Sequence, residues 1–74
     1  MLSDIRKKRN MSQSQLASCS GVSLRSIQMY EQGHRDIDRA ELSTLLDLCC
    51  ALDCKLVDIL NDDRLKRRIN SNLV

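Results

Sequence analysis

Between residues 23 and 29 lie two side chains, Arg25 and Gln28, whose planar groups can each form a pair of hydrogen bonds with one partner. A guanidinium matches the acceptor pair of guanine in the DNA major groove, and a carboxamide matches adenine. The candidates for contacts with base edges are Ser23, Leu24, Arg25, Gln28 and Met29. The alternatives are that Arg25 contacts only phosphate and that Leu24 and Met29 are ordinary surface or interface residues.

Four cysteines and one histidine raise the alternative of metal or redox chemistry. Cys49, Cys50 and Cys54 fall close together, but structural zinc sites usually combine two CxxC-like pairs or a Cys/His set, which this sequence lacks. We therefore predict no metal and no cofactor, and we expect His34 to be solvated. The sequence has one histidine and no paired carboxylates, so it offers no set of side chains for general acid/base catalysis. We therefore do not predict an enzyme.

Length and composition favour one small helical domain. The 74 residues include no Pro, Phe or Trp and a single Tyr, and aliphatic residues carry the apolar content. The longest apolar run, residues 48–52, is far too short to cross a membrane, and we expect a cytoplasmic protein with no membrane partner.

Charge is distributed unevenly along the chain. Residues 1–37 hold six Lys/Arg against three Asp/Glu, residues 38–63 hold two against seven, and residues 64–74 hold four against none. A positive first half joined to a negative middle suggests one face for a polyanion and another for solvent or a partner, the alternative being an ordinary mixed surface.

Helix signals predict five short helices, at about residues 2–9, 12–20, 24–32, 39–52 and 56–60. Ser12 and Gln15 form a capping-box pattern, Gly21 suits the end of the second helix, and Ser23 caps the third, which Gly33 ends. Two short helices joined by a tight turn with glycine have the spacing of a helix-turn-helix.

The remaining elements follow from apolar spacing. Residues 34–38 are predicted to be a polar loop, and the inward face of helix 39–52 is predicted to be Leu42, Leu45, Leu46, Cys49 and Leu52. The domain is expected to cover residues 1–61. The basic tail, 62–74, either extends as an amphipathic turn or frays in solvent.

The stretch MSQSQLASCSGVSLRSIQMYEQG resembles the Cro/C1-type (XRE-like) helix-turn-helix family, and the similarity covers about residues 2–60. It implies an all-α, lambda-repressor-like fold, a compact bundle of five short helices. Two departures are Asp53, where the family favours Gly, and residues 36–38, where it commonly has Pro and basic residues. The second departure weakens the expected contacts between this loop and phosphate.

The resemblance also implies roles for individual residues. Gln13, at the positive start of a helix, is expected to contact the DNA backbone, and the full set of phosphate contacts is Ser12, Gln13, Gln32 and Arg39. Arg39 could equally pair with Asp36 or Asp38. Arg6 and Glu31 are expected to form a structural ion pair. Cys49 and Cys54 occupy apolar positions of the family pattern, whereas Cys50 and Cys19 are expected to face solvent.

The expected function is a sequence-specific, DNA-binding transcriptional regulator, and we expect a repressor that binds a palindromic operator as a homodimer. Apolar residues left over near the C-terminus motivate dimerisation: Leu56, Ile59, Leu60, Leu65 and Ile69. Lys7, Lys8 and Arg9 are expected to form a solvated basic face, from which one could reach phosphate. The alternatives are an antitoxin-like module whose C-terminal region binds a protein partner, and a regulator switched by its cysteines.

Overall fold

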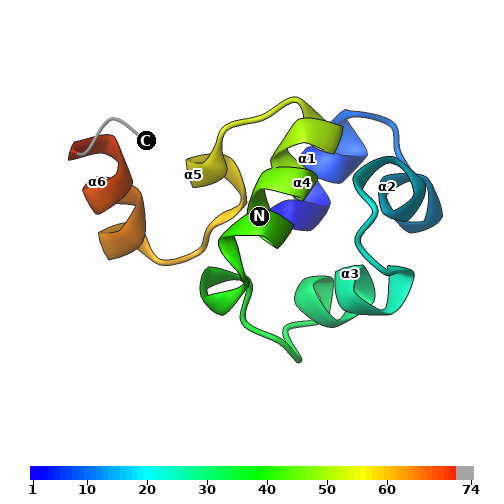
Figure 1. The fold of residues 1–74 in the computed structure, drawn as a ribbon, viewed down its shortest axis with the longest axis horizontal. Coiled ribbons are helices and arrows are strands. Elements are labelled where there is room, and N and C mark those ends of the chain that lie inside the picture. Colours follow the sequence, from blue (N-terminus) through cyan, green and yellow to red (C-terminus); the bar gives the residue numbers. More distant parts are fainter. Residues whose placement is uncertain (72–74) are drawn as a thin grey trace.

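The computed structural model describes residues 1–71, and all the regular elements in that range are helices joined by short loops (Figure 1). Its elements are α1 (Leu2–Lys8), α2 (Gln13–Ser20), α3 (Leu24–Glu31), the 3₁₀ helix η1 (Ile37–Arg39), α4 (Leu42–Leu52), α5 (Leu56–Ile59) and α6 (Asp63–Ser71). The all-α prediction is confirmed, but a sixth α-helix occupies much of the segment expected to be a tail. Residues 72–74 of that tail lie outside the described residues. No helix in the described range is long and apolar enough to span a membrane.

Local hydrogen bonds explain the two helices at the centre of the motif. The Ser12 hydroxyl accepts from the Gln15 amide at 3.0 Å, and the Gln15 side chain accepts from the Ser12 amide at 2.7 Å, which completes the capping box. Gly21 ends α2 with φ +77°, a conformation that costs glycine little. Ser23 then caps α3 by accepting from Ser26 at 3.1 Å. The predicted starts and stops are therefore confirmed.

The core is built around α4, which packs against α2 and α5. The buried residues of α4 are Leu45, Leu48, Cys49 and Leu52, a single face with helical spacing. Two predicted core positions were wrong, because Leu42 is 59% exposed and Leu46 is 48% exposed. Leu48, which was not predicted, is fully buried in their place.

The start of α4 also differs from its prediction. The chain forms η1 at residues 37–39, and α4 begins only at Leu42, so Arg39 ends the 3₁₀ helix instead of starting α4. Asp36 caps η1 by accepting from the Asp38 amide at 3.0 Å, and Asp38 accepts from the Asn61 amide at 2.7 Å. Ile37 lies between them and is buried. The predicted polar loop is therefore partly a core segment.

Arg9 connects α1 to the end of α4. Its guanidinium donates to the Leu52 carbonyl at 2.7 Å and to the Asp53 carbonyl at 2.9 Å. Asp53 ends α4 in the left-handed conformation with φ +49°, at the position where the resemblance leads one to expect glycine. A cation at a helix C-terminus satisfies free carbonyls and the helix dipole. Arg9 is exposed, as predicted for the basic face, but its contacts give it a structural role that was not predicted.

Replacing Arg9 by Met should lower the free energy of unfolding by about 1–2 kcal/mol, because two charge-assisted hydrogen bonds to carbonyls are lost. Urea unfolding followed by circular dichroism measures the change. Lys8→Met is the matched control, since Lys8 is exposed on the same helix, and it should change stability by less than about 0.5 kcal/mol. Equal losses in the two variants would contradict the structural role of Arg9.

Candidate nucleic-acid interface

The N-terminal part of α3 presents its side chains to solvent. Ser23 and Arg25 are exposed, and Leu24 is 38% exposed. Ile27 is fully buried and Tyr30 packs against the core, so the opposite face of α3 anchors the helix to the domain. Gln28 and Met29 are half-buried. This arrangement leaves the first turn of α3 as the part that can enter a groove and reach base edges.

The start of α2 lies beside the end of α3. The Gln13 side-chain nitrogen Nε2 donates to Glu31 Oε1 at 3.0 Å, and the next residue, Gln32, is the exposed C-cap of α3. A carboxamide nitrogen carries two hydrogens, so Gln13 keeps a second N–H that can be donated to phosphate. Ser12 is exposed next to it. Three of the four residues predicted to contact phosphate are therefore close to one another.

Arg6 of α1 and Glu31 of α3 form an ion pair with two parallel hydrogen bonds. Arg6 Nε donates to Glu31 Oε2 at 2.8 Å and Nη2 donates to Oε1 at 3.0 Å. The Arg6 and Glu31 side chains are only 12% and 7% exposed. Arg6 Nη1 donates to the Met11 carbonyl at 2.8 Å, so the guanidinium also holds the segment that leads into α2.

The pair shifts the pKa of both groups in the direction that keeps them charged. Burial alone would raise the pKa of Glu31, but hydrogen bonds from Arg6 and Gln13 outweigh it, and the pKa of the carboxyl is lowered from 4.5. The hydrogen bond to Glu31 raises the pKa of Arg6. Because the same carboxylate accepts from Gln13, the charged state of Glu31 also orients a residue predicted to contact DNA.

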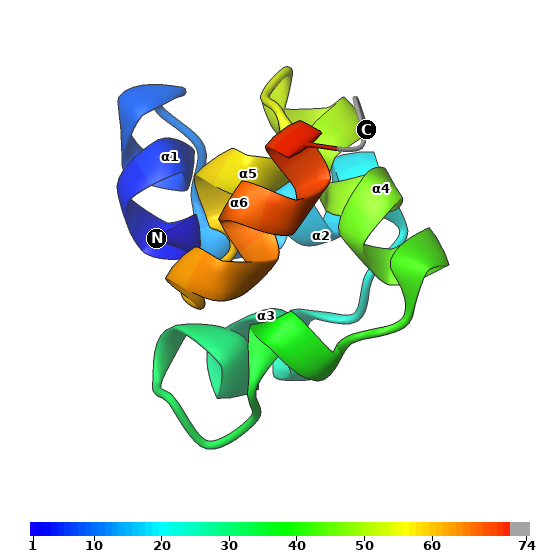
Figure 2. The same cartoon turned by 90° about the vertical axis from the view of Figure 1, so that its left-hand side faces the viewer.

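Two arginines flank α3 on the side of the following loop. Arg39 is exposed on η1, which lies at the same edge of the molecule as α3, and it forms no ion pair with Asp36 or Asp38 within residues 1–71 (Figures 1 and 2). Arg35 donates to the Ser26 hydroxyl at 3.1 Å and lies over the Tyr30 ring at 5.7 Å. Arg35, two residues after Gly33, was not among the residues predicted from the sequence.

The comparisons with known proteins identify this arrangement. A family model described as helix-turn-helix matches residues 2–59, which include α1 to α5. The chain belongs to the Cro/C1-type helix-turn-helix family. No curated protein and no solved structure matches the chain.

As a helix-turn-helix protein of this family, the chain is a DNA-binding transcription regulator. The match ends at Ile59, so α6 lies outside it. Within the matched region, α3 is exposed at its first turn and α2 begins beside the end of α3. Three features hold the two helices of the motif in place. They are the N-caps Ser12 and Ser23, the three-residue turn at positions 21–23, and the Arg6–Glu31 ion pair.

The four cysteines differ in exposure. Cys49 is buried, Cys54 is half-buried, and Cys19 and Cys50 are exposed, and all four thiols are free. Burial, with a smaller effect of the neighbouring Cys54, raises the pKa of the Cys49 thiol to about 12. Burial also raises the pKa of Cys54. Both thiols are thus protonated at neutral pH, which disfavours the reactive thiolate that a redox switch requires.

Proposed function

We propose that this protein is a sequence-specific transcriptional repressor that reads the major groove with the first turn of α3. One observation carries the proposal: two elements present suitable groups at the same time. Arg25 is exposed on α3, and the start of α2 offers Gln13 and free backbone amides to phosphate. Gln32 and Arg39 extend the phosphate contacts, and Arg35 adds to them. A repressor acts by occupying an operator, which a small domain of this kind can do without further chemistry.

The experiment is a selection from a pool of random duplexes, with the bound fraction recovered and sequenced. A specific repressor should enrich one short sequence with two-fold symmetry, with its half-sites about one helical turn apart. Binding without any enriched sequence would contradict sequence-specific reading. Placing the enriched site across a promoter, with and without the protein, then tests repression by the fall in transcript.

The structure changes the basis for the homodimer. Ile59 and Leu60 are buried, and Leu56, Leu65 and Ile69 pack against the same core, so the apolar residues first credited with dimerisation are engaged within one chain. Among the exposed large apolar residues, which also include Met1 and Leu24, Leu42 and Leu46 lie one turn apart on α4. Leu46 also borders a hollow lined by Leu56 and Val57. We propose this surface of α4 as the contact between two copies.

Replacing Leu46 by Glu should raise the Kd of self-association by about tenfold or more. Each copy would bring one negative charge to the apolar contact, and the two charges would repel each other. Sedimentation equilibrium measures the effect. Asp47→Asn is the control on the same helix, because Asp47 is exposed one residue away and is not apolar. A wild-type protein that stays monomeric with operator DNA present would contradict the homodimer itself.

The antitoxin-like alternative predicts that a protein partner binds the C-terminal region, with or without DNA binding by α3. Acidic or bulky apolar residues on the first turn of α3 would favour it, whereas this turn carries one apolar residue, Leu24, between the polar Ser23 and Arg25. A failure to enrich any sequence, together with a protein partner that protects the C-terminal region, is the outcome that would support this alternative.

A further inference from the structure

Two cysteine side chains meet where α4 ends. The Cys54 amide donates to the Cys49 carbonyl at 3.1 Å, and the Asp53 amide donates to the Cys50 carbonyl at 3.4 Å. With Asp53 in the left-handed conformation, these two bonds form a Schellman motif, which brings the side chains at the positions of Cys49 and Cys54 into contact. The two thiols are hydrogen-bonded to each other, and both are free. The end of the helix therefore holds two sulfur atoms side by side.

Both thiols line one hollow of about 530 Å³, to which α4, α5 and α6 contribute residues. Its apolar walls are Leu46, Leu56 and Val57, and its other polar residues are Lys55 and Asn70. Cys49 is buried, whereas Cys54 is half-buried, so a ligand would reach the pair from the side of Cys54. Among the described residues that line the hollow there is no carboxylate. The pair is therefore an accessible site whose ligand atoms are both sulfur.

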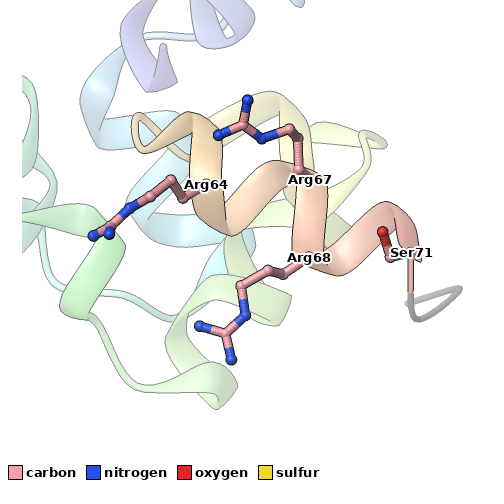
Figure 3. A pocket seen from close by; sticks show the side chains of 4 residues that line it. All are labelled: Arg64, Arg67, Arg68 and Ser71. Atoms are coloured by element: carbon pink, nitrogen blue, oxygen red, sulfur yellow. The ribbon is translucent and has the colours of Figure 1, made fainter.

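A second hollow, lined by residues of α6, has the opposite chemistry (Figure 3). Its volume is about 340 Å³, and its lining residues are Arg64, Arg67, Arg68 and Ser71. Guanidinium groups repel cations and have no acceptor atom to offer them. Of these two hollows, the one at the cysteine pair is the one that can bind a cation.

Two thiols without a third ligand favour a soft ion that needs only two ligands. Within residues 1–71, no group of three or more His, Cys, Asp and Glu residues could hold a metal ion, so the four-ligand set of a structural zinc site is absent there. Thiolate sulfur favours soft ions, of which copper(I) is the biological example with a low number of ligands. The expectation of no metal rested on the ligand set of zinc, and copper(I) needs only two sulfurs.

We propose that Cys49 and Cys54 form a copper(I) site, with the two sulfur atoms on opposite sides of the ion. Binding breaks both S–H bonds, forms two S–Cu bonds and releases two protons to solvent. The copper enters and remains as copper(I), so no electron is transferred. Two thiolates and one monovalent ion leave a net charge of −1, which the ammonium group of Lys55 in the same hollow offsets.

The two thiols differ in how readily they can become ligands. Burial raises the pKa of Cys49 to about 12. Burial and Asp58 also raise the pKa of Cys54, but the hydrogen bond from Cys49 and the charge of Arg9 lower it. A metal ion displaces the proton of a coordinating thiol, so these raised pKa values reduce the affinity without preventing binding. We expect the half-buried Cys54 to bind the ion first and Cys49 to close the site.

The test compares two variants that each keep two thiols. Cys19→Ala with Cys50→Ala leaves Cys49 and Cys54. The matched control, Cys19→Ala with Cys54→Ala, leaves Cys49 and Cys50, which are adjacent on α4 and point about 100° apart. Each variant is titrated with copper(I) under nitrogen, in competition with the coloured chelator bathocuproine disulfonate. Circular dichroism verifies that both keep their helices.

The variant with Cys49 and Cys54 should bind one copper(I) ion per chain, more than about 100-fold more tightly than the control. This factor exceeds the 10- to 100-fold that is typical for loss of a group behind a metal ligand, because the control lacks a ligand itself. Native mass spectrometry should show a single chain that has gained one copper and lost two protons. Equal affinities of the two variants, or a copper that bridges two chains of the first variant, would overturn the proposal.

Discussion

Replacing Glu31 by Gln should lower the free energy of unfolding by about 3 kcal/mol or more, because it leaves the Arg6 charge uncompensated in a nearly closed site. The neutral side chain also turns a donor toward a guanidinium that needs two acceptors. A domain of this size is stable by only about 4–11 kcal/mol, so the melting temperature should fall by roughly 12–24 °C. Thermal unfolding followed by circular dichroism measures it.

Two further variants make the test specific to the pair. Glu41→Gln changes the other glutamate of the chain, which is exposed and makes no side-chain capping bond. This variant should leave the free energy of unfolding nearly unchanged. Arg6→Met combined with Glu31→Leu removes both charges and should recover most of the loss, because apolar replacement of a buried pair is often neutral. A double variant as unstable as Glu31→Gln would show that packing, not charge, is responsible.

The pair also determines how stability depends on acid. Because the folded protein lowers the pKa of Glu31 from 4.5, its contribution is fully present above about pH 4.5. It is lost as the pH falls through the lowered value, where the carboxylate takes up a proton. The difference in stability between wild type and Glu31→Gln should therefore shrink between about pH 5 and pH 2. A constant difference over that range would exclude the ion pair as its source.

Replacing Arg25 by Ala should weaken binding to the selected operator by about 1–3 kcal/mol, which corresponds to roughly 5- to 150-fold in Kd. Arg25 is exposed on the first turn of α3, where side chains reach base edges. If it forms a bidentate contact with guanine, the preference at one base position should disappear. Fluorescence anisotropy with operator duplexes varied at each position measures both effects.

Arg25→Lys distinguishes base reading from a phosphate contact. Lysine keeps the charge but lacks the planar fork, so a base-reading role predicts a loss close to that of Arg25→Ala. If Arg25 contacts only phosphate, Lys should retain most of the affinity. In that case Arg25→Ala would weaken all sequences about equally and make the salt slope shallower by about 1.

Local features of the sequence predicted most of the secondary structure. Ser12, Gln15, Gly21 and Ser23 act within a few residues of themselves, through capping bonds and a left-handed glycine, so their effect does not depend on the rest of the chain. The same local pattern carried the resemblance to the helix-turn-helix family, which the family model confirms over residues 2–59. The roles of individual residues at DNA stay predictions.

Apolar spacing alone did not determine which face of α4 is buried. Leu42 and Leu46 form a stripe beside that of Leu45, Leu48 and Leu52, and both stripes satisfy helical periodicity. The neighbouring helices α2 and α5 cover one stripe and leave the other exposed. Such a choice depends on contacts between distant segments, which a periodic pattern does not contain.

By itself, the sequence determined the helical class, the caps and turn of the helix-turn-helix, and the uneven charge along the chain, since each depends on residue type and short spacing. Only the tertiary structure decided that Arg9 binds the end of α4, that Ile37 enters the core, and that Leu65 and Ile69 hold α6 against the domain. In each case the partner belongs to a different element of the fold, and for Arg9 it lies more than forty residues away. Partners at that separation are selected by packing of the whole domain, and the same packing turns the arginines of α6 toward solvent.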